Sequence, residues 1–404
     1  MVMSELSLVM VTMDWQAGTA TFYRSDNKTA TVDIKTTKSA PSSRIKRMHW
    51  ALQRNRMFVE TTLGDAIEFE MPAQIGDQLD GRLVVYLDQN VWSLVAQALH
   101  DPQWAGRPAD RAGALRLARL VQESKIVLPL SSGHYTETTK WSDDQSRYRL
   151  ALTTLQLSRG WQMRDPFAMR RQELSAALRS HAGIPVVPVP PVFTLDAYAA
   201  SRDMEPSQVS AEFTPGQASM LQALTYATVM IDVMLDADQI PPTTATIGWA
   251  TANQAFSDWL DSEVARPGPR KRKSVDVLLL QDISREIAEE ATAAGLTVSQ
   301  MSAWIRGPMF RDMAAMPALG LYRELLQQRH LNVGTVWRPN DLTDMIYLSS
   351  AAGYADIVVA ERHMTAIIRQ GLHRQRRPRN IYRSLQEAIP AIEAQIEGGT
   401  TLSS

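Results

Sequence analysis

Acidic residues follow apolar runs of the chain, and their spacing indicates a site built from carboxylates. Asp88 comes directly after the run Leu83–Leu87, and Glu361 comes directly after Ile357–Ala360. Continuous apolar runs rich in β-branched residues are typical of strands buried on both faces of a parallel sheet. Because the carboxyl ends of parallel strands meet at the edge where open α/β sheets bind ligands, we expect the two acids to lie together.

Other acids could join them at the same edge. Glu137 lies one or two helical turns after the run Ile126–Leu130, Asp341 and Asp344 open a predicted helix, and Asp356 precedes the last run. The alternative for Asp341 is that it only complements the helix dipole. Clustered carboxylates repel one another, and a divalent cation removes that repulsion. Oxygen ligands favour Mg²⁺ or Mn²⁺ over zinc, so either ion is the expected cofactor.

A basic stretch begins next to Glu361 and is the predicted substrate-binding segment. Between Arg362 and Arg383 it holds arginines at seven positions and no acid. Arginines beside an acidic cluster favour contact with phosphates, and the alternative is a solvated basic surface. Other polar residues at the same edge could position substrate. The full set of expected substrate-binding residues is Asn90, Ser131, Ser132, His134, Arg362, Arg374, Arg376 and Arg377.

Four short motifs occur along the chain in a fixed order. They are Y-L-D-Q-N at Tyr86–Asn90, S-x-x-x-x-x-E at Ser131–Glu137, N-D-L-T-D at Asn340–Asp344 and A-D-I-V-V-A-E at Ala355–Glu361. Together they resemble the PIN-like nuclease family, over residues 82–140, 183–194 and 331–365. The resemblance implies an α/β domain with a parallel sheet and an acidic cluster that binds Mg²⁺ or Mn²⁺. It also implies cleavage of phosphodiester bonds, most often in RNA, to a 5′-phosphate and a 3′-hydroxyl.

By this resemblance the catalytic residues are Asp88, Glu137, Asp344 and Glu361, and the same acids are metal ligands together with Asp341. The family usually carries Asp at the end of its last strand, where this chain has Glu361. Asp356 is the alternative last ligand.

Three other functions remain open. A haloacid-dehalogenase-like phosphatase also begins with an apolar strand and an acid, but its general acid would stand at Asn90, which cannot donate that proton. A PIN-like module could bind RNA or a protein without cutting. The chain could also be a toxin or defence effector held inactive by another segment. Expected partners are nucleic acid, most often RNA, with a homodimer or an inhibitory protein left open.

Composition limits these interpretations. The chain has 404 residues, 45% hydrophobic and 21% charged, which is typical of a globular protein of more than one domain. It has no cysteine, which excludes disulfides and cysteine-based metal sites. The net charge is −1, so attraction to nucleic acid must be local. Without an apolar stretch long enough to span a bilayer, a cytoplasmic protein with no membrane partner is expected.

The expected fold class is α/β, a PIN-like three-layer domain with a central parallel sheet, extended by a β-rich module and a helical insertion. The insertion should contain helices at Val275–Ala291 and Met220–Leu235, with a basic loop at Pro267–Lys273. The β-rich module could bind a partner or cover a sheet edge. The expected boundaries are 1–80 for the β-rich module, 81–195 and 331–384 for the PIN-like domain, 196–330 for the insertion and 385–404 for a last helix and tail.

Overall fold

The computed structural model of the chain describes residues 7–34, 44–71, 78–101, 103–104, 106–140, 143–196, 199–200, 225, 227–235 and 244–400. The chain divides into two compact units that are interleaved along the sequence. The first comprises Met1–Arg82, Trp92–Met163 and Phe193–Ile240, and the second comprises Leu83–Val91, Arg164–Val192 and Pro241–Ser404. The chain therefore enters each unit more than once.

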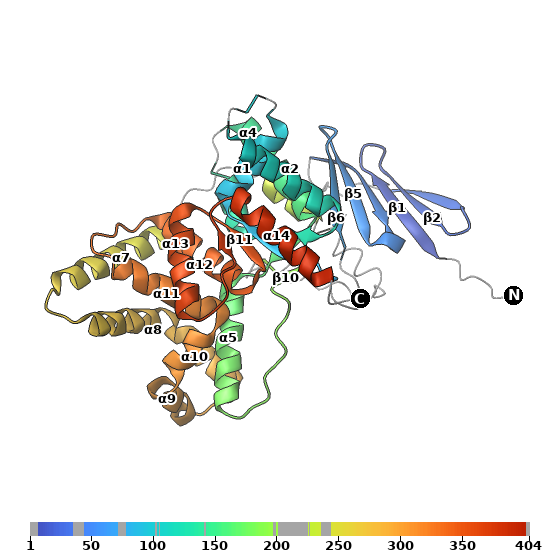
Figure 1. The fold of residues 1–404 in the computed structure, drawn as a ribbon. Coiled ribbons are helices and arrows are strands. Elements are labelled where there is room, and N and C mark those ends of the chain that lie inside the picture. Colours follow the sequence, from blue (N-terminus) through green and yellow to red (C-terminus); the bar gives the residue numbers. More distant parts are fainter. Residues whose placement is uncertain are drawn as a thin grey trace. The chain divides into compact units, whose positions relative to one another are not determined.

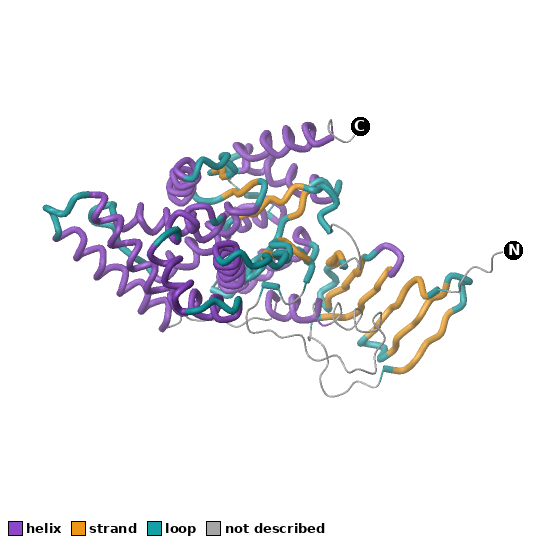
Figure 2. Tube along the Cα trace, turned by 90° about the horizontal axis from the view of Figure 1, so that it is seen from below, coloured by secondary structure: helices purple, strands orange, loops and turns teal. Residues whose placement is uncertain are grey.

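The first unit begins with an antiparallel six-stranded sheet of order β3-β2-β1-β4-β5-β6 (Figure 2). Its strands are β1 (Leu8–Asp14), β2 (Thr19–Arg24), β3 (Thr29–Asp33), β4 (Ile45–Ala51), β5 (Arg56–Thr61) and β6 (Ala66–Glu70). Burial alternates along β5, where Met57 and Val59 are in the core. The prediction that the N-terminal residues are rich in β-structure is confirmed, but they belong to the same compact unit as the helices of residues 92–163. β4 begins at Ile45 and buries every second or third side chain.

The rest of the first unit is mainly helical. Its elements are α1 (Gln89–His100), whose first residues belong to the second unit, α2 (Pro108–Gln122), β8 (Ile126–Val127), α3 (Ser132–Thr138), α4 (Asp144–Ser158), β9 (Gln162–Met163) and β10 (Phe193–Thr194). β8 is shorter than the predicted strand Ile126–Leu130, because Pro129 has no N–H to pair. β9 and β10 form a separate antiparallel pair.

The second unit contains a parallel sheet, as the apolar runs Leu83–Leu87 and Ile357–Ala360 predicted. In it, β11 (Ile357–Val359) lies between β7 (Leu83–Leu87) and β12 (Ile381–Tyr382), and both pairings are parallel. Ile357 is in register with Val85. All residues of β11 are buried, as the continuous apolar run indicated. β12 was not predicted, because only two residues of it pair.

Helices cover this sheet and make up most of the second unit (Figure 1). They are α5 (Pro166–His181), α7 (Thr244–Ser262), α8 (Gly268–Ala293), α9 (Val298–Arg306), α10 (Met309–Ala315), α11 (Pro317–His330), α12 (Pro339–Tyr354), α13 (Arg362–Arg374) and α14 (Leu385–Thr400). α11 packs along α12 and α13, so the helices predicted as an insertion share a core with the elements that follow. The helix expected at Val275–Ala291 lies within α8, and the described part of the one expected at Met220–Leu235, residues 227–235, is helical.

The prediction of a loop at the basic segment Pro267–Lys273 is wrong. α8 begins at Gly268 and includes the basic residues. Proline in the first turn favours this start, because its missing N–H would have no partner there anyway.

A buried carboxylate joins α5 to the start of α11. Glu173 accepts hydrogen bonds from the backbone N–H groups of Ala318 and Leu319, both at 2.8 Å, and from the hydroxyl of Tyr354 at 2.6 Å. Burial nevertheless raises the pKa of Glu173, and the three hydrogen bonds oppose that rise. The carboxylate thus satisfies N–H groups that the first turn of a helix leaves without partners.

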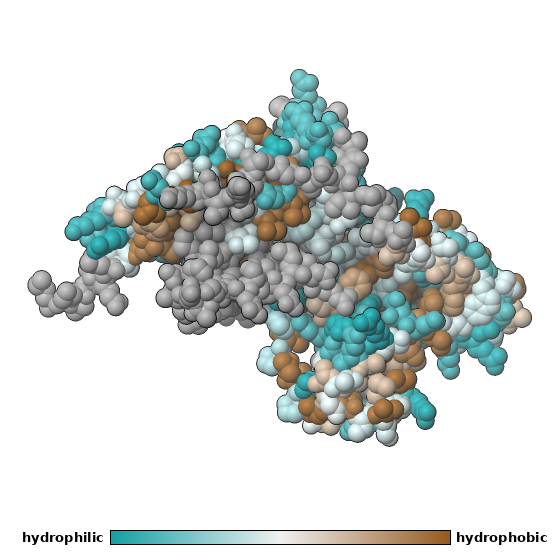
Figure 3. Space-filling view, turned by 180° about the vertical axis from the view of Figure 1, so that it is seen from behind, coloured by the Kyte–Doolittle hydropathy of each residue, from teal (hydrophilic) through white to brown (hydrophobic). Residues whose placement is uncertain are grey.

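The surface of the described residues is mixed in character. On the face shown in Figure 3, hydrophilic and hydrophobic residues are interspersed. Among the described residues, no helix combines the length and the apolar character needed to cross a bilayer.

Candidate functional site

Asp88 and Glu361 lie together at the carboxyl end of the parallel sheet. The backbone N–H of Glu361 donates to Oδ2 of Asp88 at 3.4 Å, and that of Gln89 donates to Oδ1 at 2.9 Å. The amide of Asn90 donates to Oε1 of Glu361. The two acids therefore meet because β7 and β11 are adjacent and parallel, and Asn90 orients Glu361 in this structure.

The environment of Asp88 disfavours its charge. Burial raises the pKa of Asp88 to about 6, and the nearby charge of Glu361 adds to the rise, while the two N–H groups lower it. Glu361 itself is exposed. The ionised form of Asp88 is therefore destabilised by its surroundings, and a cation bound beside it would offset that cost.

Asp356 lies at the opposite end of the sheet, which corrects its expected role as an alternative ligand beside Asp88. Its Oδ2 accepts a hydrogen bond from the N–H of Val84 at 2.7 Å, at the amino end of β7. Four residues of extended strand separate Val84 from Asp88, a length of roughly 13 Å. A single ion cannot bind both Asp88 and Asp356.

Asp341 is engaged in holding the start of α12. Its Oδ2 accepts from Nη2 of Arg329 at 2.6 Å and from the backbone N–H of Arg338 at 2.7 Å. These contacts favour the alternative that Asp341 serves only the start of the helix over the expected metal-ligand role. Asp344, one turn further along α12, is half-buried, and its charge raises the pKa of Arg329 against the lowering effect of burial.

The predicted residues after β8 belong to the first unit and make local contacts there. Ser131 is fully buried and is the N-cap of α3, and its N–H donates to Nδ1 of His134 at 3.1 Å. His134 is buried and meets Trp92 edge to face. These contacts make Ser131 and His134 structural residues rather than the substrate contacts expected. The backbone carbonyl of Ser132 accepts from Thr136, and Glu137 is half-buried on α3.

The basic stretch is divided between structural and exposed arginines. Arg377 is half-buried and donates to the carbonyls of Pro317, at 3.1 Å, and Gly353. A Cβ at Gly353 would lie 2.9 Å from the carbonyl of Pro317, so only glycine permits this approach of α12 to α11. Arg377 is therefore a structural residue, which corrects its predicted role in substrate binding.

The other predicted arginines are exposed. Arg374 pairs with Glu324 at 3.1 Å. Among the described residues, no ion pair involves Arg362 or Arg376. These two cations thus remain candidates for phosphate contact.

A buried polar row in the second unit was not predicted. Trp337 donates to Oγ of Ser257 at 2.8 Å, Ser257 lies 2.8 Å from Nδ1 of His330, and Nε2 of His330 lies 3.0 Å from Oδ1 of Asn253. Because Oδ1 of Asn253 can only accept, Nε2 of neutral His330 carries the proton, so Nδ1 accepts from the hydroxyl of Ser257. The order resembles a nucleophile, a base and an orienting group, but Ser257 is only 3% exposed, so we assign the row to structure.

The buried polar row around His330 predicts that the folded protein loses stability at acidic pH. Burial lowers the pKa of His330 to about 4, whereas an unfolded histidine titrates near 6.5. The unfolded state therefore binds more protons between these values, and stability should fall by roughly 3 kcal/mol as pH drops from 6.5 to 4. Denaturant midpoints at several pH values would measure the loss. His330→Asn should weaken this dependence, and the exposed-site control His181→Asn should keep it; equal slopes in both variants would contradict the assignment.

Among the described residues, no group of three or more histidines, aspartates or glutamates is placed to hold a metal ion. The acids that the structure brings together are the pair Asp88 and Glu361. Comparison of the chain with family models, with curated proteins and with solved structures found no match.

Proposed function

We propose that this chain is a metal-dependent nuclease that hydrolyses RNA, with Asp88 and Glu361 at its centre. The observation that carries the proposal is the pairing of these two carboxylates at the carboxyl ends of adjacent parallel strands. Ligand sites of open α/β sheets lie at this edge. The resemblance of the surrounding motifs to PIN-like nucleases supports the same assignment, as does the raised pKa of Asp88.

The residues present fit a Mg²⁺ or Mn²⁺ ion. Mg²⁺ is often bound by one or two carboxylates together with water and substrate phosphates, and Asp88 and Glu361 supply two such carboxylates. Asp344 on α12 is a third acid of the proposal, and Glu137 of the first unit stays a prediction. When bound, the ion would neutralise charge on the phosphate and make a water molecule more acidic.

The side chains of the chain would have separate tasks. Asp88, held by the N–H groups of Gln89 and Glu361, provides a fixed anion at the bottom of the site. The amide of Asn90 holds the carboxylate of Glu361 through a hydrogen bond. Exposed Arg362, next along the chain, is placed to contact a phosphate of the strand.

The proposal is tested by incubating the purified full chain with labelled single-stranded RNA and single-stranded DNA. Cleavage should require Mg²⁺ or Mn²⁺, should stop in excess EDTA, and should be faster on RNA. The products should carry a 5′-phosphate. An absence of cleavage of either strand under all metal conditions would reject catalysis and leave a nucleic-acid-binding module, which a binding titration would then detect.

Divalent ions should stabilise the fold through the same acids. At ten times its Kd, a bound ion adds about 1.4 kcal/mol to the free energy of unfolding, so millimolar Mg²⁺ or Mn²⁺ should raise the Tm. Asp88→Asn should remove the shift, because it removes one ligand charge. Asp356→Asn is the matched control, since this acid lies at the other end of the sheet. A shift that persists in Asp88→Asn would place the ion elsewhere.

A further inference from the structure

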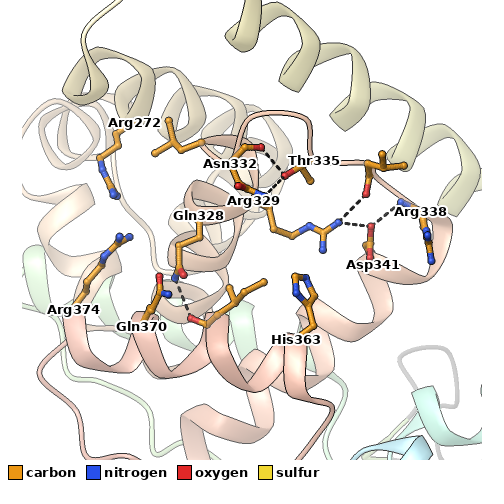
Figure 4. A pocket seen from close by; sticks show the side chains of 13 residues that line it. Arg272, Gln328, Arg329, Asn332, Thr335, Arg338, Asp341, His363, Gln370 and Arg374 are labelled. Atoms are coloured by element: carbon orange, nitrogen blue, oxygen red, sulfur yellow. Dashed lines mark hydrogen bonds and ion pairs between the residues drawn. The ribbon is translucent and has the colours of Figure 1, made fainter.

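A polar pocket of about 590 Å³ lies within the second unit (Figure 4). It is lined by α8, α11, α13 and the segment 331–338 that leads into α12. Its size is within the range of small-molecule sites, about 300 to 1,000 Å³. One of its lining residues, His363, is two positions after Glu361, but the proposed nuclease centre does not use the pocket.

The lining carries an excess of positive charge. It includes Arg272, Arg329, Arg338 and Arg374 and one acid, Asp341. In Figure 4 the guanidinium groups of Arg272 and Arg374 point toward each other across one end of the pocket. The two positive charges repel each other, and an anion bound between them would be attracted by both.

Two residues of α11 bind the guanidinium groups of Arg272 and Arg374. Gln327 accepts from Nη1 of Arg272 at 2.7 Å, and Glu324 pairs with Nη1 of Arg374 at 3.1 Å. Each contact occupies Nη1 and fixes the side chain, and the other N–H groups remain to donate. A planar guanidinium held in this way matches the oxygens of a phosphate.

Arg329 is the most deeply buried arginine of the pocket lining. It is 7% exposed, and its guanidinium stacks over Trp337 at 4.6 Å from the ring centre. Nη2 donates to Asp341 and to the carbonyl of Val336, whereas Nε is buried with no hydrogen-bond partner among the described residues. Because Asp341 already pairs with this guanidinium, Arg329 adds positive charge to the lining, but the phosphate contacts are assigned to Arg272 and Arg374.

The remaining lining suits the rest of a nucleotide. Gln328, Gln370 and Asn332 carry amides that can both donate and accept, as the edges of bases require. The apolar side chains of Val336 and Ile367 could contact a base or ribose. Arginines for a phosphate and amides with apolar groups for a nucleoside are thus present in one cavity.

We propose that this pocket binds a phosphate-bearing nucleotide, with Arg272 and Arg374 contacting the phosphate. The binding needs neither metal nor cleavage, so it goes beyond the nuclease function. A free nucleotide and the phosphorylated end of a strand present the same chemistry, and the experiment separates the two sources.

Binding is measured by calorimetry on the full chain in EDTA, with the four nucleoside 5′-monophosphates and their nucleosides as probes. At least one monophosphate should bind about ten times or more tighter than its nucleoside, the effect of one charge-assisted hydrogen bond. Arg374→Ala, at an exposed position, and Arg272→Ala should each lower that affinity about tenfold. Arg285→Ala is the matched control, because it lies on the same helix as Arg272 and is 88% exposed.

Steric blocking gives a second variant that keeps every arginine. Gln370→Trp places a large ring in the pocket from an exposed position of α13 and should abolish binding. Equal affinity for nucleoside and monophosphate, no binding of any probe at millimolar concentration, or binding unchanged in both arginine variants would overturn the proposal.

Oligonucleotides identify the source of the phosphate. Tighter binding of a 5′-phosphorylated oligonucleotide than of its 5′-hydroxyl form, lost in Arg374→Ala, supports a strand end. Binding of free monophosphates alone supports a mononucleotide site. Nucleotide binding by a chain that cuts no RNA would reject the nuclease and keep the pocket, and cleavage without nucleotide binding would do the reverse.

Discussion

Asp88→Asn should reduce RNA cleavage by more than about 100-fold. Losing a group that only supports a metal ligand already costs about 10- to 100-fold, and Asp88 is proposed to be a ligand itself. The substitution keeps the shape of the side chain and removes one charge. RNA affinity should stay equal or rise, because a negative charge near the phosphate is gone. Rates at saturating RNA, together with binding titrations, would separate the two effects.

The same variant should be more stable than wild type without metal. Asp88 has a folded pKa of about 6 and an ordinary value of 3.8, so its ionisation as pH rises through this window destabilises the fold. Removing the ionisable group should therefore add up to about 3 kcal/mol at pH 7 and almost nothing below about pH 3. Asp356→Asn should retain cleavage. A cleavage rate equal in Asp88→Asn and wild type would reject Asp88 as a catalytic residue.

Glu173→Ala should destabilise the second unit by about 3 to 5 kcal/mol. The change leaves the N–H groups of Ala318 and Leu319 and the hydroxyl of Tyr354 buried without their acceptor. Each unsatisfied buried group costs about 1 to 3 kcal/mol, and nearby Arg377 also loses a favourable charge. Denaturant midpoints with a probe in the second unit would measure the loss.

Glu289→Ala is the matched control for this stability prediction. Glu289 forms ion pairs with Arg171 and Arg285 at a more exposed position, where solvent screens the charges, so its loss should change stability little. If Glu173→Ala lowered the midpoint no more than this control, the carboxylate would not be what holds the start of α11.

Local patterns predicted the strands and the acids at their ends. The runs Leu83–Leu87 and Ile357–Ala360 are apolar throughout, which is typical of buried strands, and the meeting of Asp88 and Glu361 follows from their parallel pairing. β11, however, has an acid near each end, Asp356 and Glu361. Sequence alone did not exclude Asp356, whereas the register places it beside Val84.

The roles that depend on packing between distant segments could not be predicted. Arg374 and Arg377 lie close together in the same basic stretch, but Arg377 is half-buried between two helices and Arg374 is exposed. The pocket combines arginines that are far apart along the chain, and no short pattern contains them. The row at His330 likewise depends on the crossing of α7, α11 and the segment that precedes α12.

The interleaving of the two units affects the order of events during synthesis. β7 leaves the ribosome early, but its partner β11 follows much later, since 272 residues separate Val84 from Asp356. At about 5 to 20 residues per second, this interval lasts tens of seconds. Until then Asp88 has no Glu361 beside it, so a nascent chain in which β11 has not yet been made cannot assemble the proposed nuclease centre.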